Sequence, residues 1–396
     1  MTKAMSKRLL SVDRFRGILI FAMCFFEIAA DFPVLGFISR FAGNSKLSKL
    51  MIMNNFPLAD IEAPSFLFLI SLSYFGSFKK RALQDKKQAY FHFIERYLIF
   101  MGLGSIMVSG EYLFVNGEAD PLIIQTILMF VSAISLALGL LVKLFKLNNN
   151  YKDILFKILK YSLMILGLIG IILGIRDAII LFSGSDLSLC KHWSILHEIG
   201  FTGLLGLLVV NLKMRDKIVV WFSLLISYSL VLSFPGMIDL FDVIVFGGIA
   251  GTFGWLIVLL GGIILMEFFK NKLYKEYGIS CIILAILVII LVMVMPINSS
   301  AVTPNFVLIS LLIDVIVFTI ISLLNNKEFK YDFLMWLGRN PLPIFFMTVL
   351  FRLIEKMWNP AYDTSFIIAF SYTFGTIGLN LILAYYLYKK NVIFKV

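Results

Sequence analysis

The sequence predicts an all-α membrane protein that crosses the bilayer about twelve times, with both ends of the chain in the cytoplasm. Its 396 residues are 60% hydrophobic and only 15% charged, and the mean hydropathy is +0.94. No water-soluble globular class has this composition. The apolar residues form blocks of about 20, the length of a membrane-spanning helix, and not the short alternating segments of an outer-membrane barrel.

Lysine and arginine set the orientation, because they gather in every second gap between the apolar blocks. Short loops rich in these residues stay in the cytoplasm. Residues 79–87, 213–217 and 270–275 are such gaps, whereas the gaps between the basic ones are neutral, acidic or mixed. The expected spans are 16–36, 58–78, 93–115, 121–142, 153–175, 193–211, 218–235, 243–269, 278–297, 304–324, 341–357 and 364–388. About ten to twelve spans fit this pattern.

We expect one integral membrane domain over residues 1–396, in the cell membrane, since no connection is long enough for a soluble domain. The formal net charge of +11 fits this topology and not nucleic-acid binding, because each basic cluster adjoins an apolar block. Cys24, Cys190 and Cys281 are far apart, with neither a disulfide framework nor a metal-ligand spacing. No metal cofactor is therefore expected. Membrane lipids are the implied partners, and a homo-oligomer is left open.

Ionisable side chains in or beside the spans are the candidate functional residues, because a charge in a membrane is costly. Guanidinium groups fit phosphate geometry, and a carboxylate can take a proton from a substrate. The cytoplasmic candidates are Arg14, Arg16, Arg96, Arg339 and the neighbouring Asn340. The outer candidates flank the first loop and are Glu27, Asp60 and Glu62.

Two further residues stand out singly. His197 lies about one turn inside the outer end of its span, where an imidazole can take a proton from a hydroxyl or amine. The alternative is a buried histidine bonded to a neighbouring helix. Asp314 lies near the bilayer centre. There it can serve as a proton relay, or it can form a hydrogen bond that packs two helices together. Its candidate partners are Arg352 and Lys160.

Residues 11–17 read Ser-Val-Asp-Arg-Phe-Arg-Gly, and residues 60–73 begin Asp-Ile-Glu-Ala-Pro and continue into a basic loop. These segments resemble the first and second spans of the heparan-α-glucosaminide N-acetyltransferase family of membrane acyltransferases. Weaker likenesses are residues 195–200 and the Gly-Arg-Asn-Pro-Leu segment at 338–342. The likeness covers most of the chain in order.

The resemblance implies an enzyme that moves an acetyl or other acyl group from cytoplasmic acyl-CoA to a sugar or glycolipid at the outer face, as in polysaccharide modification. The cytoplasmic candidates would bind the CoA phosphates. Glu27 or His197 would take the acceptor proton, and Asp60 would orient the base. Where the family is expected to carry histidines, this chain has Glu27, Leu50 and Asp60, and Thr348 in the late span.

Two other functions remain open. A proton-coupled transporter or flippase of a glycolipid or small solute would use Asp314 and the outer carboxylates as coupling groups. A catalytically silent relative would bind a ligand or partner in the membrane.

Overall fold

The computed structural model describes residues 10–30, 32, 58–114, 149–183, 193–242, 247–324, 332–358 and 365–390. These residues form helices and the turns between them, without a strand among them. Among the described residues, five helical stretches are long and apolar enough to cross a membrane, and a bent pair of helices would make a sixth. The expected all-α membrane fold is confirmed at this level. The count of twelve spans stays a prediction.

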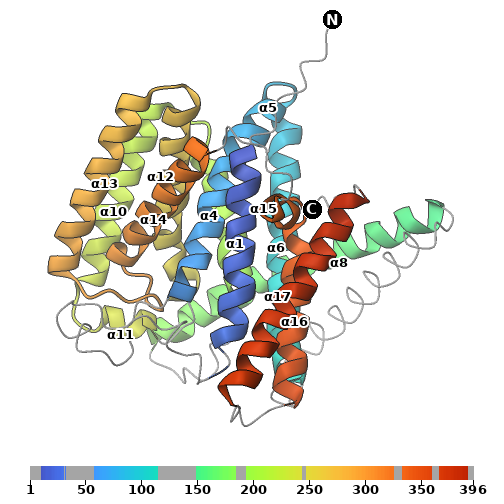
Figure 1. Ribbon diagram of the computed structural model, residues 1–396. Helices are drawn as coiled ribbons and strands as arrows, with labels where there is room; N and C mark the ends of the chain where they lie inside the picture. Colours follow the sequence, from blue (N-terminus) through green and yellow to red (C-terminus); the bar gives the residue numbers. More distant parts are fainter. Residues whose placement is uncertain are drawn as a thin grey trace, which may run out of the picture. The chain divides into compact units, whose positions relative to one another are not determined.

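The described helices form two compact units. The first unit contains α1 (Leu10–Ala30), η2 (Leu58–Ile61), α4 (Glu62–Ser73), α13 (Tyr274–Val294), most of α14 (Pro304–Leu324), α15 (Phe333–Arg339), α16 (Pro341–Trp358) and α17 (Phe366–Lys389) (Figure 1). The second contains η3 (Tyr74–Phe78), α5 (Lys79–Ala82), α6 (Lys86–Phe114), α8 (Asn149–Ser183), α9 (Ile195–Val209), α10 (Met214–Leu232), α11 (Met237–Asp242), α12 (Gly248–Lys270) and the first turn of α14.

Each predicted span among the described residues contains a helix, whereas the predicted span 121–142 lies outside them. The largest shift is at the first span, where α1 begins at Leu10 and not near residue 16. Hydropathy missed these first two turns because they contain Asp13, Arg14 and Arg16, which the fold buries wholly or in part. Asp13 also suits the positive N-terminal end of a helix.

Helix α1 is the centre of the first unit and packs against α15, α16, α17 and η2. Its Phe15 is fully buried and meets Phe68 of α4 and Phe318 of α14 edge to face. Edge-to-face rings pack favourably because the positive edge of one faces the negative face of the other. The three rings therefore fix α4 and α14 on one side of α1.

Small residues let the helices of the second unit approach closely. A methyl group at Gly102 of α6 would collide with the backbone of Leu163 in α8, and one at Gly167 of α8 with that of Leu98. Membrane helices associate through such close packing, since lipid gives them no hydrophobic driving force. Helix α12 packs on α8, α9 and α10, and its most apolar stretch is 83% buried.

The basic ends of three second-unit segments lie together. Lys217 near the start of α10 donates to Glu267 near the end of α12 (2.8 Å), and Lys79 of α5 lies 3.6 Å from the same carboxylate. The α10–α11 turn, at the opposite end of α10, contains no lysine or arginine. Within this unit, the alternation of basic and neutral turns in the sequence is therefore an alternation between two ends in space.

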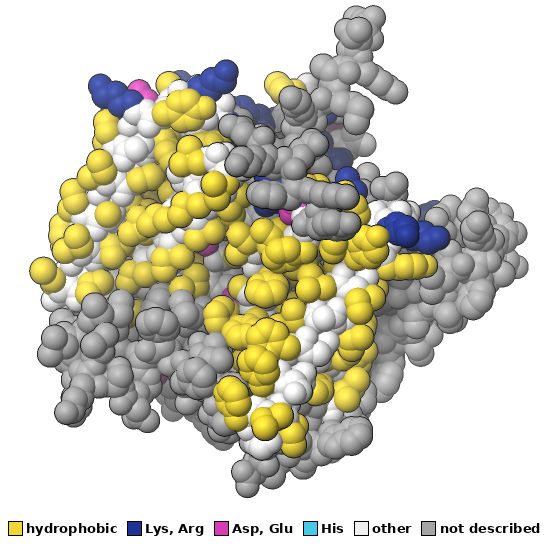
Figure 2. All heavy atoms as spheres, in the orientation of Figure 1, with side chains coloured by type: hydrophobic (Ala, Val, Ile, Leu, Met, Phe, Trp, Pro, Cys, Tyr) yellow, Lys and Arg dark blue, Asp and Glu magenta, His cyan; other side chains and the backbone are white. Residues whose placement is uncertain are grey.

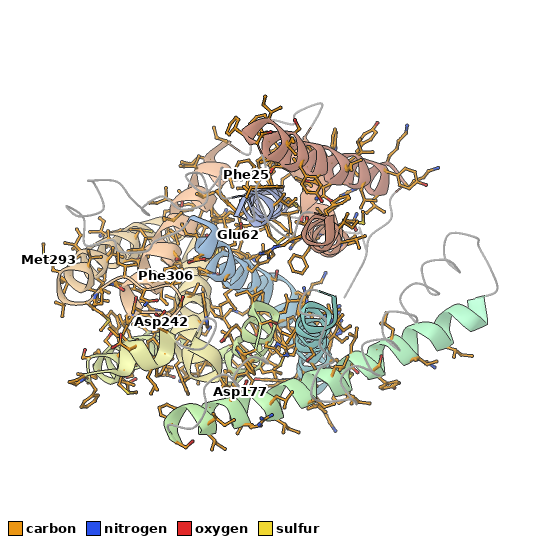
Figure 3. The ribbon with its side chains drawn as sticks, turned by 90° about the horizontal axis from the view of Figure 1, so that it is seen from below. Phe25, Glu62, Asp177, Asp242, Met293 and Phe306 are labelled. Atoms are coloured by element: carbon orange, nitrogen blue, oxygen red, sulfur yellow. The ribbon has the colours of Figure 1, made fainter. Side chains whose placement is uncertain are left out.

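Apolar side chains cover the outer faces of several helices. Figure 2 shows them on one face of the molecule, with the visible lysines and arginines gathered at helix ends. Helix α13 is the extreme case, with only 11% of its apolar stretch buried. Its Met293, labelled in Figure 3, is 77% exposed. Such faces suit contact with lipid.

Candidate functional site

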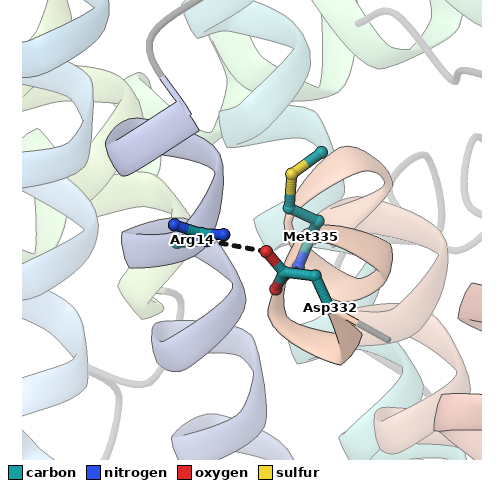
Figure 4. A network of polar contacts seen from close by, with 3 residues as sticks. All are labelled: Arg14, Asp332 and Met335. Atoms are coloured by element: carbon teal, nitrogen blue, oxygen red, sulfur yellow. Dashed lines mark hydrogen bonds and ion pairs between the residues drawn. The ribbon is translucent and has the colours of Figure 1, made fainter. Parts of the chain in front are cut away.

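The short helix α15 is held at its first turn by an arginine of α1. Arg14 Nε donates to Asp332 Oδ2 at 2.6 Å (Figure 4). The other oxygen of Asp332 accepts from the backbone N–H of Met335 at 3.1 Å and so caps the start of α15. The Arg14 side chain is 5% exposed and that of Asp332 12%. A buried pair of this kind needs both partners, since removing one leaves an uncompensated charge.

A second arginine of α1 holds the far end of α15. Arg16 Nη1 donates to Asp13 Oδ1 (3.1 Å) and to the carbonyl of Gly338 (3.2 Å). A methyl group at Gly17 would collide with the backbone of Leu334, and one at Gly338 with that of Asp13. The two glycines thus allow α1 and α15 to touch backbone to backbone. The two sequence segments that contain them, 11–17 and 338–342, therefore lie side by side.

Arg339 and Asn340 lie at the break between α15 and α16. The axes of Phe333–Arg339 and Pro343–Arg352 differ by 95°, and Pro341 is the first residue of α16, where proline needs no N–H partner. Asn340 is fully buried.

The Arg339 guanidinium lies 4.7 Å from the Tyr388 ring of α17, and its Nε has no hydrogen-bond partner among the described residues. We call Arg14, Arg16 and Arg339 the arginine cluster.

Further along α1, three polar side chains from three helices meet in an apolar surrounding. Cys24 Sγ lies 3.0 Å from Thr348 Oγ1 of α16, and Asn380 Nδ2 of α17 donates to Thr348 Oγ1 (3.0 Å) and to Cys24 Sγ (3.5 Å). Each is at most 2% exposed. Ile20, Ile344 and Ile377 surround them. We call Cys24, Thr348 and Asn380 the Cys24 triad.

The predicted outer carboxylates approach the same helix. The short helix η2, which contains Asp60, packs against α1, and Glu62 lies within electrostatic range of Cys24. Figure 3 shows Glu62 beside α1. Asp60 and Glu62 are both partly exposed. Glu27 is in α1, but its side chain lies outside the described part of the structure.

Asp314 is fixed by a serine and not by either basic residue suggested for it. Ser65 Oγ of α4 donates to Asp314 Oδ1 at 2.5 Å, and Oδ2 is buried without a hydrogen-bond partner among the described residues. Lys160 instead pairs with Glu95 in the second unit at 2.7 Å. The 2% exposed Asp314 therefore joins α14 to α4 and keeps one oxygen for a further donor.

His197 belongs to the second unit and is completely buried. Its Nδ1 accepts from the backbone N–H of Ser194 (3.2 Å) and lies 2.9 Å from that residue's hydroxyl. This bond places the ring proton on Nε2, which then donates to Ser105 Oγ of α6 at 3.0 Å. The serine in turn donates to the carbonyl of Leu166 in α8 (3.2 Å). This network matches the alternative of a histidine that joins helices.

Glycines on both sides confine this ring. A methyl group at Gly104 of α6 or at Gly170 of α8 would press on the imidazole. The neighbouring Glu198 is equally buried and accepts from Trp193 Nε1 (2.5 Å) and from Thr252 Oγ1 of α12 (3.0 Å). Both polar side chains of this segment are thus bonded to other helices or to the preceding turn. The catalytic role of His197 stays a prediction.

Arg96 also belongs to the second unit. Its guanidinium lies 5.6 Å from the Phe100 ring one turn further along α6. Four residues before it, at the basic end of α6, burial lowers the pKa of His92, and the positive charges of Arg81 and Arg96 lower it further. Arg96 is therefore not part of the arginine cluster, which belongs to the first unit.

The structure brings together most of the sequence candidates of the first unit along α1. The arginines and Asn340 lie around its first turns, and η2 with Asp60 packs on it as well. The sequence did not indicate the Cys24 triad, because cysteine, threonine and asparagine are ordinary residues in apolar helices. The one signal was Thr348, a hydroxyl at a position where the resemblance expects a histidine.

A comparison of the sequence with protein-family models and with curated proteins finds no match.

Proposed function

We propose that the protein is a multi-pass acyltransferase of the cell membrane, which moves an acetyl or other acyl group from cytoplasmic acyl-CoA to a sugar or glycolipid at the outer face. One observation carries the proposal. Two segments more than 300 residues apart, 11–17 and 338–342, meet at α1 and α15 and gather three arginines. Arg339 has stacking contact with Tyr388 and no ion pair among the described residues, so its guanidinium can bind a phosphate.

In this proposal the CoA phosphates and the acceptor bind near opposite ends of α1, and the pantetheine arm of acyl-CoA brings the thioester to the acceptor. The arginine cluster binds the CoA phosphates, Glu27 takes the proton of the acceptor, and Asp60 orients that carboxylate. The acceptor oxygen or nitrogen attacks the thioester carbonyl, the new ester or amide bond forms, and the carbon–sulfur bond breaks. CoA leaves as its thiolate and takes up a proton. His197 remains a candidate base in the second unit.

The test is binding of acetyl-CoA to the purified full chain. A ligand that binds the folded state alone raises its stability by about 2.7 kcal/mol at 100 times its dissociation constant. We expect Arg339→Ala to weaken acetyl-CoA binding about 10- to 100-fold, because a hydrogen bond to a charged group contributes about 1.5–3 kcal/mol. Arg339→Lys should restore part of the affinity.

Lys389→Ala is the matched control, since Lys389 is an exposed cation that stacks on Tyr385 of the same helix end. It should bind acetyl-CoA like the wild type. If Arg339→Ala and Lys389→Ala bind equally well, the proposed donor site is wrong. Transfer of labelled acetyl to glucosamine, followed by product analysis, then tests the reaction itself.

A second candidate function is proton-coupled transport of a small solute or glycolipid. The Asp314 carboxyl favours it, because it is buried between two helices and one of its oxygens has no partner among the described residues. Such a group can take up and release a proton.

A further inference from the structure

The Cys24 triad contains one buried oxygen that no described residue pairs. The Thr348 hydroxyl donates to the carbonyl of Ile344 (3.0 Å), so its oxygen accepts both from the Cys24 thiol and from Asn380. The second N–H of Asn380 points to the Cys24 sulfur. Every donor of the triad is therefore used. Asn380 Oδ1 is left without a partner, although Asn380 is only 1% exposed.

An unpaired amide oxygen is costly in an apolar surrounding. A buried polar atom without a partner destabilises a protein by about 1–3 kcal/mol. Helix packing alone would be served as well by an apolar side chain at this position. The unpaired Asn380 Oδ1 therefore indicates that a ligand binds next to the triad and donates a hydrogen bond to this oxygen.

The position of the triad indicates what this group is. Cys24 follows Arg16 by eight residues, about 12 Å along a helix axis, and Glu62 lies within electrostatic range of it. The triad thus lies between the arginine cluster and the outer carboxylates. It contains no carboxylate, amine or guanidinium of its own, so its chemistry matches a neutral N–H or O–H group.

We propose that Asn380 Oδ1 accepts a hydrogen bond from a neutral N–H or O–H of the substrate, which makes the triad a positioning site of the first unit. This inference rests on the proposed acyltransferase function. Two parts of the substrates carry such a group. One is an amide N–H of the pantetheine arm of acyl-CoA, and the other is a hydroxyl of the sugar acceptor.

The experiment compares Asn380→Leu with the wild type by calorimetry on the purified full chain. Four probes are used: coenzyme A, adenosine bisphosphate, pantetheine and glucosamine. If the amide arm binds at the triad, Asn380→Leu weakens coenzyme A and pantetheine about tenfold, equivalent to about 1.4 kcal/mol, and leaves adenosine bisphosphate unchanged. If the sugar hydroxyl binds there, glucosamine alone is weakened.

Thr373→Val in the same helix is the matched control. Thr373 is equally buried, but its hydroxyl donates only to Ala369 of its own helix. Asn380→Ala replaces Asn380→Leu if the latter is not monodisperse after purification. Equal binding of all four probes by the wild type, the Asn380 variant and Thr373→Val would overturn the inference.

The failure of the proposed function is recognised separately. In that case the wild type binds neither coenzyme A nor adenosine bisphosphate, whatever residue 380 is. A change in glucosamine binding in Asn380→Leu would still support the triad as a site, and unchanged glucosamine binding would reject it.

Discussion

At the scale of single residues, the structure separates side chains that join helices from side chains that keep an unused atom. The two nitrogens of His197 are both bonded to hydroxyls or backbone, and both oxygens of Glu198 accept from donors. Arg96, Asp314, Arg339 and Asn380 each retain a buried polar atom without a partner in the described part of the chain. A substrate or proton can bind such an atom without breaking an existing hydrogen bond, so these four are better candidates than His197 and Glu198.

Asp314 gives a prediction at this scale. Asparagine can also accept the Ser65 hydroxyl, so Asp314→Asn should leave the thermal stability of the detergent-solubilised protein nearly unchanged. Asp314→Leu leaves the buried Ser65 hydroxyl without an acceptor and should destabilise the protein by about 1–3 kcal/mol. Calorimetric unfolding measures both. Equal stability of the two variants would contradict the hydrogen bond.

The same Asp314→Asn variant separates the two proposed functions. In liposomes loaded with a pH-sensitive dye, solute-coupled proton movement upon glucosamine addition should be lost in the variant if the protein is a transporter. Acyl transfer needs no net proton movement across the bilayer, so unchanged acetyl transfer in Asp314→Asn supports the enzyme.

The sequence was informative on charged residues and uninformative on neutral ones. A charge in an apolar block is rare, so Arg14, Arg16 and Asp314 were visible as candidates without a structure. Their partners were not, because Asp332 and Ser65 are 318 and 249 residues away from the groups they bind. Neutral polar residues such as Asn380 gain meaning only when the fold shows which of their atoms are paired.

At the scale of helices, the contact between α1 and α15 depends on glycine. We expect Gly17→Ala to destabilise the protein by about 1–3 kcal/mol, because the added methyl group forces the two backbones apart. Gly375→Ala in α17 is the control, since a methyl group there meets nothing within 4 Å, and alanine favours a helix over glycine by up to about 1 kcal/mol.

Thermal unfolding in detergent measures this difference. The result would contradict the close helix contact if Gly17→Ala were as stable as Gly375→Ala. The Arg339→Ala and Lys389→Ala proteins serve as a further comparison, because neither residue lies at the glycine contact.

Helix positions were predictable because apolar length is a strong signal in a membrane protein. The predicted span 304–324 coincides with α14, and the predicted span 58–78 covers η2, α4 and η3. Hydropathy could not predict the break at Arg339 and Asn340, since α15 and α16 together look like one polar loop followed by one span. Bends of this kind depend on packing around the proline and not on composition.

At the scale of the whole molecule, the alternation of basic turns predicts the topology. The turn between α9 and α10 and the turn between α12 and α13 are basic, whereas the turn at 295–303 carries no lysine or arginine. In sealed vesicles, trypsin should cut at 79–87 and 270–275 only when it reaches the cytoplasmic face. Lysed vesicles are the control. Cleavage from the outer face would reverse the proposed orientation.

The positions of this protein differ in how strictly the fold requires one particular residue, and helix α13 is the most tolerant of the long described helices. Only 11% of its apolar stretch is buried, so about half of its side chains face away from the rest of the protein and need not match the shape of a neighbour. Isoleucine, leucine, valine and methionine are then interchangeable at the exposed positions of α13. Related chains can differ at these positions as long as the helix stays hydrophobic. The opposite holds at Gly17 and Gly338, where even an added methyl group would collide with the backbone of the facing helix.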